Sequence, residues 1–164
     1  MNNKILTALL ALTFMSAALA GCTSNDDTDD AEPQPDVVKI GFLNPATGPL
    51  AQDAAGFEYG ALQAVIDLNA AQTTTVFEAV VADSGCDGTV GAAAAQSLVD
   101  ANVVAVAGAA CSGASMAANA VLSAAGIPMI SYASTNPSLS DATAYPNFFR
   151  VVPSDAIQGP AAAA

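Results

Sequence analysis

Short apolar runs alternate with segments of helical periodicity along most of this 164-residue chain. The runs are rich in β-branched residues and are bounded by Gly, Pro or Asn, which is typical of strands. After the first run, Phe57, Ala61 and Val65 recur at the spacing of one helical face. This alternation predicts an α/β fold with a mostly parallel, doubly wound sheet. The expected strands are residues 37–43, 75–82, 103–107, 127–131 and 147–152, and the expected helices are 56–71, 87–101, 115–125 and one that begins near 155.

The composition excludes several classes of function. The chain has no histidine, so His-based acid–base catalysis, nucleophile–His pairs and His-ligated zinc are all excluded. Its formal net charge is −12, and its cations are Lys4, Lys39 and Arg150. Because nucleic-acid binding requires clustered basic residues, nucleic acid is excluded as a direct partner. The acidic cluster before residue 36 lacks the spacing of a calcium-binding EF-hand loop, so we expect no metal site and no cofactor.

Residues 1–21 have the features of a secretory signal peptide. Lys4 precedes an uncharged apolar run over residues 5–20, and the run ends in small residues. The run has sixteen residues, whereas a membrane-spanning helix needs about twenty. The alternative is an uncleaved anchor helix.

The segment Leu19-Ala-Gly-Cys22 resembles the lipobox of secreted lipoproteins, in which the cysteine is acylated and becomes the mature N-terminus. The alternative is ordinary cleavage that leaves a free thiol. Residues 22–36 carry six carboxylates and two prolines without apolar periodicity, so we expect a disordered acidic tether. The folded domain is then expected over residues 37–164, in the periplasm or at the cell surface, anchored to the membrane by a lipid at Cys22.

The loops beyond the carboxyl ends of the strands are the expected ligand site, as in other open parallel sheets. Loop 108–115 has the glycines and the serine of a phosphate-binding loop, but Ala114 stands where the lysine would be. This substitution disfavours a nucleoside triphosphate, whereas N–H groups and a Ser hydroxyl at a helix N-terminus suit a carboxylate. The alternative is a plain helix cap by Ser112 or Ser115. The other loops expected at this edge are residues 44–55, 83–88 and 132–140.

The segment 132–138 follows the fourth expected strand and offers hydroxyl groups and backbone carbonyls at the same edge. Carbonyl oxygens and the Thr135 hydroxyl can accept hydrogen bonds from an ammonium group. By itself this segment is a polar turn around Pro137. Beside an anion site, it predicts one half of a clamp for an amino acid.

Two cysteines remain once Cys22 is assigned to lipidation. Cys86 and Cys111 each lie just beyond the end of an expected strand, so neighbouring strands would bring them together. Outside the cytoplasm such a pair is expected to form a disulfide. The alternative is a reactive Cys111 at a helix start, where the pKa of a thiol falls.

Several motifs, in their order and spacing, resemble the leucine/isoleucine/valine-binding protein family, the type I periplasmic solute-binding proteins of ABC importers for amino acids. The resemblance covers most of the chain from Val38 to Ala163. It implies one α/β lobe of a two-lobed protein and a disulfide between Cys86 and Cys111. The matching motifs are Lys39-Ile-Gly-Phe-Leu, Thr47-Gly-Pro-Leu-Ala51, Gly60-Ala-Leu-Gln-Ala, Asp83-Ser-Gly-Cys86, Cys111-Ser112, Gly126-Ile-Pro-Met-Ile-Ser131, Thr135-Asn-Pro137, Phe149-Arg150 and Gln158-Gly-Pro160.

The resemblance also implies roles for individual residues. Ser112 would donate its hydroxyl to the ligand carboxylate. Ala133 would contribute backbone groups, and Thr135 both backbone and side-chain groups, to the carboxylate and the ammonium. Family members often place an aromatic or aliphatic ring against the ligand side chain where this chain has Asp53. Asp53 departs from this pattern and favours a polar or amide-like solute, whereas the resemblance itself implies a branched-chain amino acid.

The length of the chain departs from the family pattern. Family members have two lobes that close on the ligand, and this chain stops at Ala164, where a helix is expected to continue. We therefore expect a fragment with the N-terminal lobe and without the second lobe. Such a half-cleft should have no measurable amino-acid affinity, and micromolar binding in calorimetry would contradict this. The expected membrane partner of the complete protein is an ABC permease.

Other functions require features of their own. A ligand-binding ectodomain of a membrane sensor with the same fold would continue into a spanning helix. An enzyme would need a paired base and nucleophile, and Asp53, Asp83 and Asp87 have no such spacing. A structural surface protein would have repeats, which the sequence lacks. We therefore expect a binding protein and not an enzyme.

Overall fold

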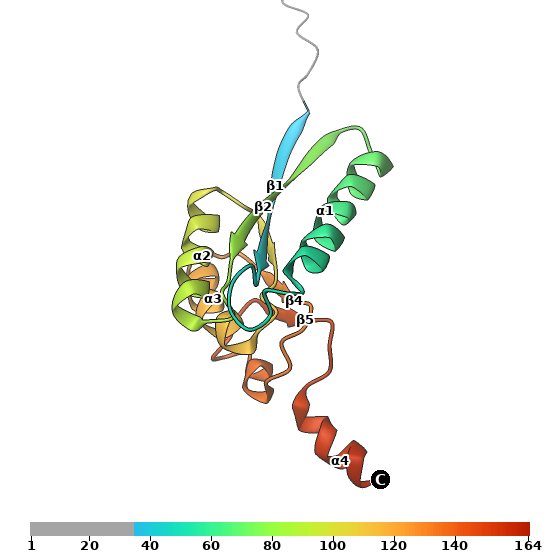
Figure 1. Ribbon diagram of the computed structural model, residues 1–164. Coiled ribbons are helices and arrows are strands. Elements are labelled where there is room, and N and C mark those ends of the chain that lie inside the picture. Colours follow the sequence, from blue (N-terminus) through green and yellow to red (C-terminus); the bar gives the residue numbers. More distant parts are fainter. Residues whose placement is uncertain (1–34) are drawn as a thin grey trace, which may run out of the picture. The chain divides into compact units, whose positions relative to one another are not determined.

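A computed structural model describes residues 35–164 of the chain. Five strands form one parallel sheet in the order β2-β1-β3-β4-β5 (Figure 1). The expected signal peptide, Cys22 and nearly all of the acidic tether lie outside the described residues. The strands are β1 Asp36–Asn44, β2 Thr75–Asp83, β3 Ala105–Ala107, β4 Met129–Ser131 and β5 Phe148–Arg150; the helices are α1 Ala54–Ala71, α2 Gly88–Asp100, α3 Ser112–Ala124 and α4 Gln158–Ala163, with 3-10 helices η1 Pro137–Ser140 and η2 Asp155–Ile157.

The predicted α/β class and parallel sheet are confirmed. The main differences are in length, since β3, β4 and β5 have three residues each. Pro128 has no N–H and precedes β4, although its carbonyl accepts a hydrogen bond from Val106 N at 3.0 Å. The helix expected from Asp155 is divided into η2 and α4. Within residues 35–164, no helix combines the length and the apolar character needed to cross a bilayer.

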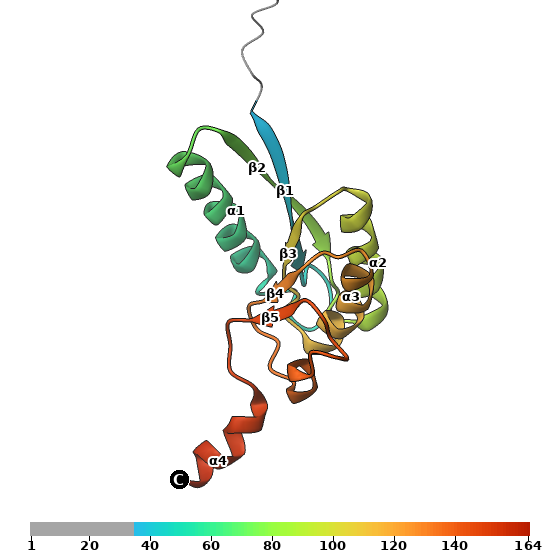
Figure 2. The same cartoon turned by 180° about the vertical axis from the view of Figure 1, so that it is seen from behind.

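Helices α2 and α3 cover one face of the sheet, which we call the closed face (Figure 2). Small residues allow the two helices to approach closely, because a Cβ at Gly91 would lie 3.0 Å from the Ala114 carbonyl oxygen. Leu98 and Leu122 are fully buried against the sheet, at 0% exposure. The buried cluster consists of Leu43, Ala94, Ala95, Leu98, Val103, Val106, Ala109, Ala114, Ala118, Leu122 and Met129.

Helix α1 packs over β1 and β2 on the opposite face, which we call the open face. The register places Phe42, Ala107, Ile130 and Phe149 in one row across β1, β3, β4 and β5. Phe42 is 4% exposed, Ile130 44% and Phe149 58%. Exposure therefore increases along the row from the strand beneath α1 towards β5.

Candidate functional site

The N-terminus of α3 is the first component of the candidate site. The helix begins at Ser112, and the residue before it, Cys111, makes no side-chain capping hydrogen bond. The neighbouring α2 differs, because the Asp87 carboxylate accepts hydrogen bonds from two N–H groups of its first turn at 2.7 and 3.0 Å. The first N–H groups of a helix need acceptors from elsewhere. The hydroxyls of Ser112 and Ser115 accept hydrogen bonds from Asn136 N and Ala109 N, outside α3. Neither is seen to cap the helix, so its first N–H groups are available to an anion.

Ser112 links the loops that follow β3 and β4. Its Oγ accepts a hydrogen bond from Asn136 N at 3.2 Å. Because the oxygen is the acceptor in this bond, the hydroxyl proton remains available to a carboxylate. Ser112 is half-buried at the edge of the sheet. It can therefore serve as a hydrogen-bond donor beside the open helix N-terminus.

Thr135 is fixed by two hydrogen bonds to Asp155. Thr135 Oγ1 donates to Asp155 Oδ2 at 2.8 Å, and Asp155 N donates to the Thr135 carbonyl at 2.9 Å. Since its proton is directed at Asp155, the Thr135 hydroxyl presents lone pairs to an external donor. Asp155 adds a negative charge next to these lone pairs. This arrangement suits a cationic group such as an ammonium.

Ala133 lies between these residues in the loop after β4. Its N–H donates to Ser131 Oγ at 3.2 Å, so this donor already has a partner within the protein. Strands β3 and β4 are neighbours in the sheet. The structure thus brings Ser112, Ala133 and Thr135 to adjacent carboxyl ends.

Asp53 lies in a different loop, between β1 and α1. Its side chain is exposed and makes no hydrogen bond to the start of α1. Strand β1 is the neighbour of β3, so the loop with Asp53 borders the same edge of the sheet. A contact between Asp53 and the side chain of a solute stays a prediction.

The predicted pairing of Cys86 with Cys111 is present as a disulfide, with 5.1 Å between the Cα atoms. The bond joins the loop before α2 to the residue that precedes Ser112. The alternative of a reactive Cys111 thiol does not apply to a cysteine in a disulfide. The disulfide thus anchors the start of α3.

Asp83 ties the loop after β1 to the end of β2. Its carboxylate accepts hydrogen bonds from Thr47 Oγ1 at 2.6 Å, Thr47 N at 3.1 Å and Gly85 N at 2.8 Å. Desolvation acts to raise the pKa of this carboxyl, but the hydrogen bonds outweigh desolvation and hold the pKa below its ordinary value of 3.8. Asp83 is therefore an ionised acceptor that shapes the loop.

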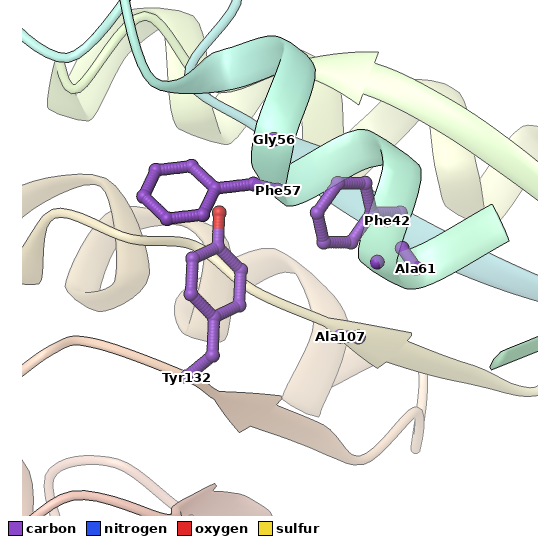
Figure 3. A pocket seen from close by; sticks show the side chains of 7 residues that line it. Phe42, Gly56, Phe57, Ala61, Ala107 and Tyr132 are labelled. Atoms are coloured by element: carbon purple, nitrogen blue, oxygen red, sulfur yellow. The ribbon is translucent and has the colours of Figure 1, made fainter. Parts of the chain in front are cut away.

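An apolar cavity of about 370 Å³ lies between α1 and the open face (Figure 3). The ring of Tyr132 packs 5.2 Å from that of Phe57 and 5.7 Å from that of Phe42, between centroids. Burial raises the pKa of Tyr132 to about 12, and its hydroxyl donates to the Leu43 carbonyl at 3.3 Å. Tyr132 thus turns towards the cavity, although the sequence grouped it with the hydroxyls of the polar edge.

Several residues that build this site were not predicted from the sequence. Asp155 contacts Thr135 across twenty residues, and Ser131 contacts Ala109 across twenty-two. No local pattern links residues so far apart. Within residues 35–164, no group of three or more His, Cys, Asp or Glu residues is placed to hold a metal ion. The residues of the site offer hydrogen-bond donors and acceptors, among them the Asp155 carboxylate.

Comparisons with known proteins extend this description. The family model described as "Receptor family ligand binding region" matches residues 59–164. A leucine-, isoleucine-, valine-, threonine-, and alanine-binding protein of Pseudomonas aeruginosa is 31% identical over 158 residues, which are 95% of this chain and 40% of that protein. Metabotropic glutamate receptor 6 of Rattus norvegicus is 54% identical over 59 residues, 36% of this chain and 7% of the receptor. The chain therefore spans less than half of these curated relatives.

Solved structures of solute-binding proteins also resemble this chain. The branched-chain amino acid transporter substrate binding protein LivJ from Streptococcus pneumoniae, in complex with isoleucine, is 34% identical and superposes with a TM-score of 0.66. The match covers 73% of this chain and 34% of that one. The fold described above is thus that of part of a solute-binding protein.

Proposed function

Because the chain belongs to the family of the receptor ligand-binding region, we propose that it forms one lobe of a protein that binds an amino acid or a related small solute. The chain spans 40% of its Pseudomonas relative. The proposed binding unit therefore includes a second lobe, which closes over the ligand and buries it. On this proposal the 164-residue chain alone has no measurable affinity.

The observation that carries the proposal is the open N-terminus of α3 beside Thr135. The first N–H groups of α3 have no side-chain cap, and Ser112 Oγ lies beside them. Together they supply the hydrogen-bond donors that an α-carboxylate needs. The Thr135 hydroxyl and the Asp155 carboxylate are acceptors, which meet the requirements of an ammonium group. Donors and acceptors on adjacent loops form a clamp for a zwitterion, which we call the amino-acid clamp.

We propose a branched-chain amino acid, or a related polar or amide-like solute, as the ligand. Support for the first comes from the Streptococcus relative, which holds isoleucine. Support for the second comes from Asp53, a polar and exposed residue in the loop that borders the clamp.

We further propose that the complete protein is an extracytoplasmic lipoprotein of an ABC importer. The lipobox at Cys22 supports a lipid anchor. The Cys86–Cys111 disulfide supports an oxidising compartment, the periplasm or the cell surface. The Streptococcus relative is named as a transporter substrate binding protein, which supports an ABC permease as the partner.

A ligand-binding ectodomain of a membrane sensor is the second candidate. It is favoured by the match to metabotropic glutamate receptor 6, at 54% identity over 59 residues. The nucleotide sequence downstream of the codon for Ala164 separates the two candidates. A second lobe followed by a stop codon would support transport, and a spanning helix would support a sensor.

The solute is identified by thermal shift of the complete two-lobe protein against the common amino acids. We expect an increase in melting temperature with branched-chain or amide amino acids, since ligand that binds the folded state stabilises it. No shift with any amino acid would contradict the proposed function.

Ser112→Ala in the two-lobe protein tests the clamp itself. Loss of a hydrogen bond to a charged group should weaken binding by about 1.5–3 kcal/mol, measured by calorimetry. Ser97→Ala is the matched control, because Ser97 Oγ donates to Ala94 O within α2 at 2.7 Å, away from the clamp. Unchanged affinity in Ser112→Ala would remove Ser112 from the site.

A further inference from the structure

Three buried serines connect the two loops of the amino-acid clamp. Ser115 lies in α3, Ser131 ends β4 and Ser134 follows in the next loop, and each is 0% exposed. Their hydroxyls meet around the backbone of Ala109 and Ala110, in the loop between β3 and α3. Buried hydroxyls that hydrogen-bond to one another and to the backbone are constrained to one arrangement, because a broken hydrogen bond leaves a buried polar group without a partner.

Ser131 contacts both loops through its hydroxyl group. Its Oγ donates to the Ala109 carbonyl at 2.6 Å and accepts from Ser134 N at 2.9 Å and Ala133 N at 3.2 Å. One oxygen atom therefore holds both loops, the one that leads to Ser112 and the one that leads to Thr135.

Ser115 and Ser134 complete the connection. Their hydroxyl oxygens are 2.8 Å apart, Ser115 Oγ accepts from Ala109 N at 3.1 Å, and Ser134 Oγ lies 3.2 Å from the Ala110 carbonyl. Ser134 immediately precedes Thr135, and Ala110 lies two residues before Ser112. A shift of these hydroxyls would move both halves of the clamp.

We propose that Ser115, Ser131 and Ser134 are positioning residues that set the spacing between the carboxylate half and the ammonium half of the amino-acid clamp. This inference rests on the proposed function, because the spacing matters only if both halves hold one ligand. The serines have no contact with the solute, since they are buried behind the loops. They act by fixing the backbone of residues 109–110 and 133–134.

Amide hydrogen exchange in the 164-residue chain tests the positioning directly. In Ser131→Ala, the amides of Ala133 and Ser134 lose their acceptor, and we expect them to exchange about tenfold faster. Ser131→Thr retains the hydroxyl and should restore slow exchange. Ser97→Ala, the matched loss of a hydroxyl in α2, should leave these two amides unchanged. Equal exchange at both amides in Ser131→Ala and the wild type would overturn the inference.

Calorimetry on the two-lobe protein tests the consequence for binding. We expect Ser131→Ala to bind the solute about tenfold more weakly, with Ser131→Thr and Ser97→Ala close to the wild type. Ser134→Ala should weaken binding in the same direction and replaces Ser131→Ala if that variant does not fold. Wild-type affinity in both alanine variants would overturn the inference and leave the proposed function intact. A wild-type protein that binds no amino acid would instead overturn the proposed function, and with it the role of the serines in a clamp.

Discussion

The two faces of the sheet differ in how completely the described residues cover them. On the closed face, α2 contributes four buried residues and α3 five. On the open face, Ala54 is the single buried residue of α1, and Ile66 in the same helix is 59% exposed. In the apolar row on this face, the exposed fraction of the side chain is 4% at Phe42 and 58% at Phe149.

This difference shows that the stability of the lobe is concentrated on one side. The closed face has small residues that allow close packing and leucines that fill the space beneath them. On the open face, the large apolar side chains of Ile130 and Phe149 are not covered by a helix among the described residues. The loops of the amino-acid clamp follow β3 and β4. Residues of these two strands pack against α2 and α3 in the buried cluster of the closed face, so the better-packed face supports the site.

A pair of leucine substitutions tests the contrast with the largest expected effect. Leu98→Ala in α2 should lower the free energy of unfolding by about 2–5 kcal/mol, since Leu98 is 0% exposed. Leu62→Ala in α1 is the matched change on the open side, where Leu62 is 38% exposed, and should lower it by less than about 1 kcal/mol. Urea unfolding measures both. Equal losses would show that the two faces contribute alike.

The disulfide is expected to have the next largest effect. It joins the loops that precede α2 and α3, the two helices of the closed face, across a separation of 25 residues. Replacing both cysteines by serine should lower the free energy of unfolding by about 2–4 kcal/mol. The measurement is urea unfolding under oxidising conditions, with reduced wild type as the control. An unchanged midpoint would mean that packing alone holds the two loops.

The smallest effect is expected at Asp83, the last residue of β2. Its pKa in the folded protein lies below the ordinary value of 3.8, so its contribution to stability is present above that value and is lost as the pH falls through the lower folded pKa. Asp83→Asn should therefore flatten part of the decline in unfolding free energy in this acidic range. Identical acid profiles for Asp83→Asn and the wild type would contradict the hydrogen-bonded role of the carboxylate.

Most of the fold could be predicted because its signals are local. Apolar runs and helical spacing are read within about ten residues, and each predicted strand and helix forms. The resemblance to leucine/isoleucine/valine-binding proteins is confirmed by the comparisons. The Cys86–Cys111 pair was predictable because both cysteines follow strand ends.

The rest depends on contacts between distant residues. Asp155 and the three buried serines join loops that are far apart in sequence, so no periodicity marks them. The orientation of Tyr132 towards the apolar cavity depends on its contacts with the rings of Phe42 and Phe57. The exposure of Ile130 and Phe149 could not be predicted either, because their apolar character is the same whether or not a helix covers them.

We propose that the solute binds at the carboxyl edge of β3 and β4. A crystal structure of the two-lobe protein with a bound amino acid would show where the solute lies. We expect the α-carboxylate within hydrogen-bond distance of Ser112 Oγ and the first N–H groups of α3, with the ammonium near Thr135 and Asp155. An amino acid seated instead in the apolar cavity beside Phe57 and Tyr132, with no contact to Ser112, would contradict it.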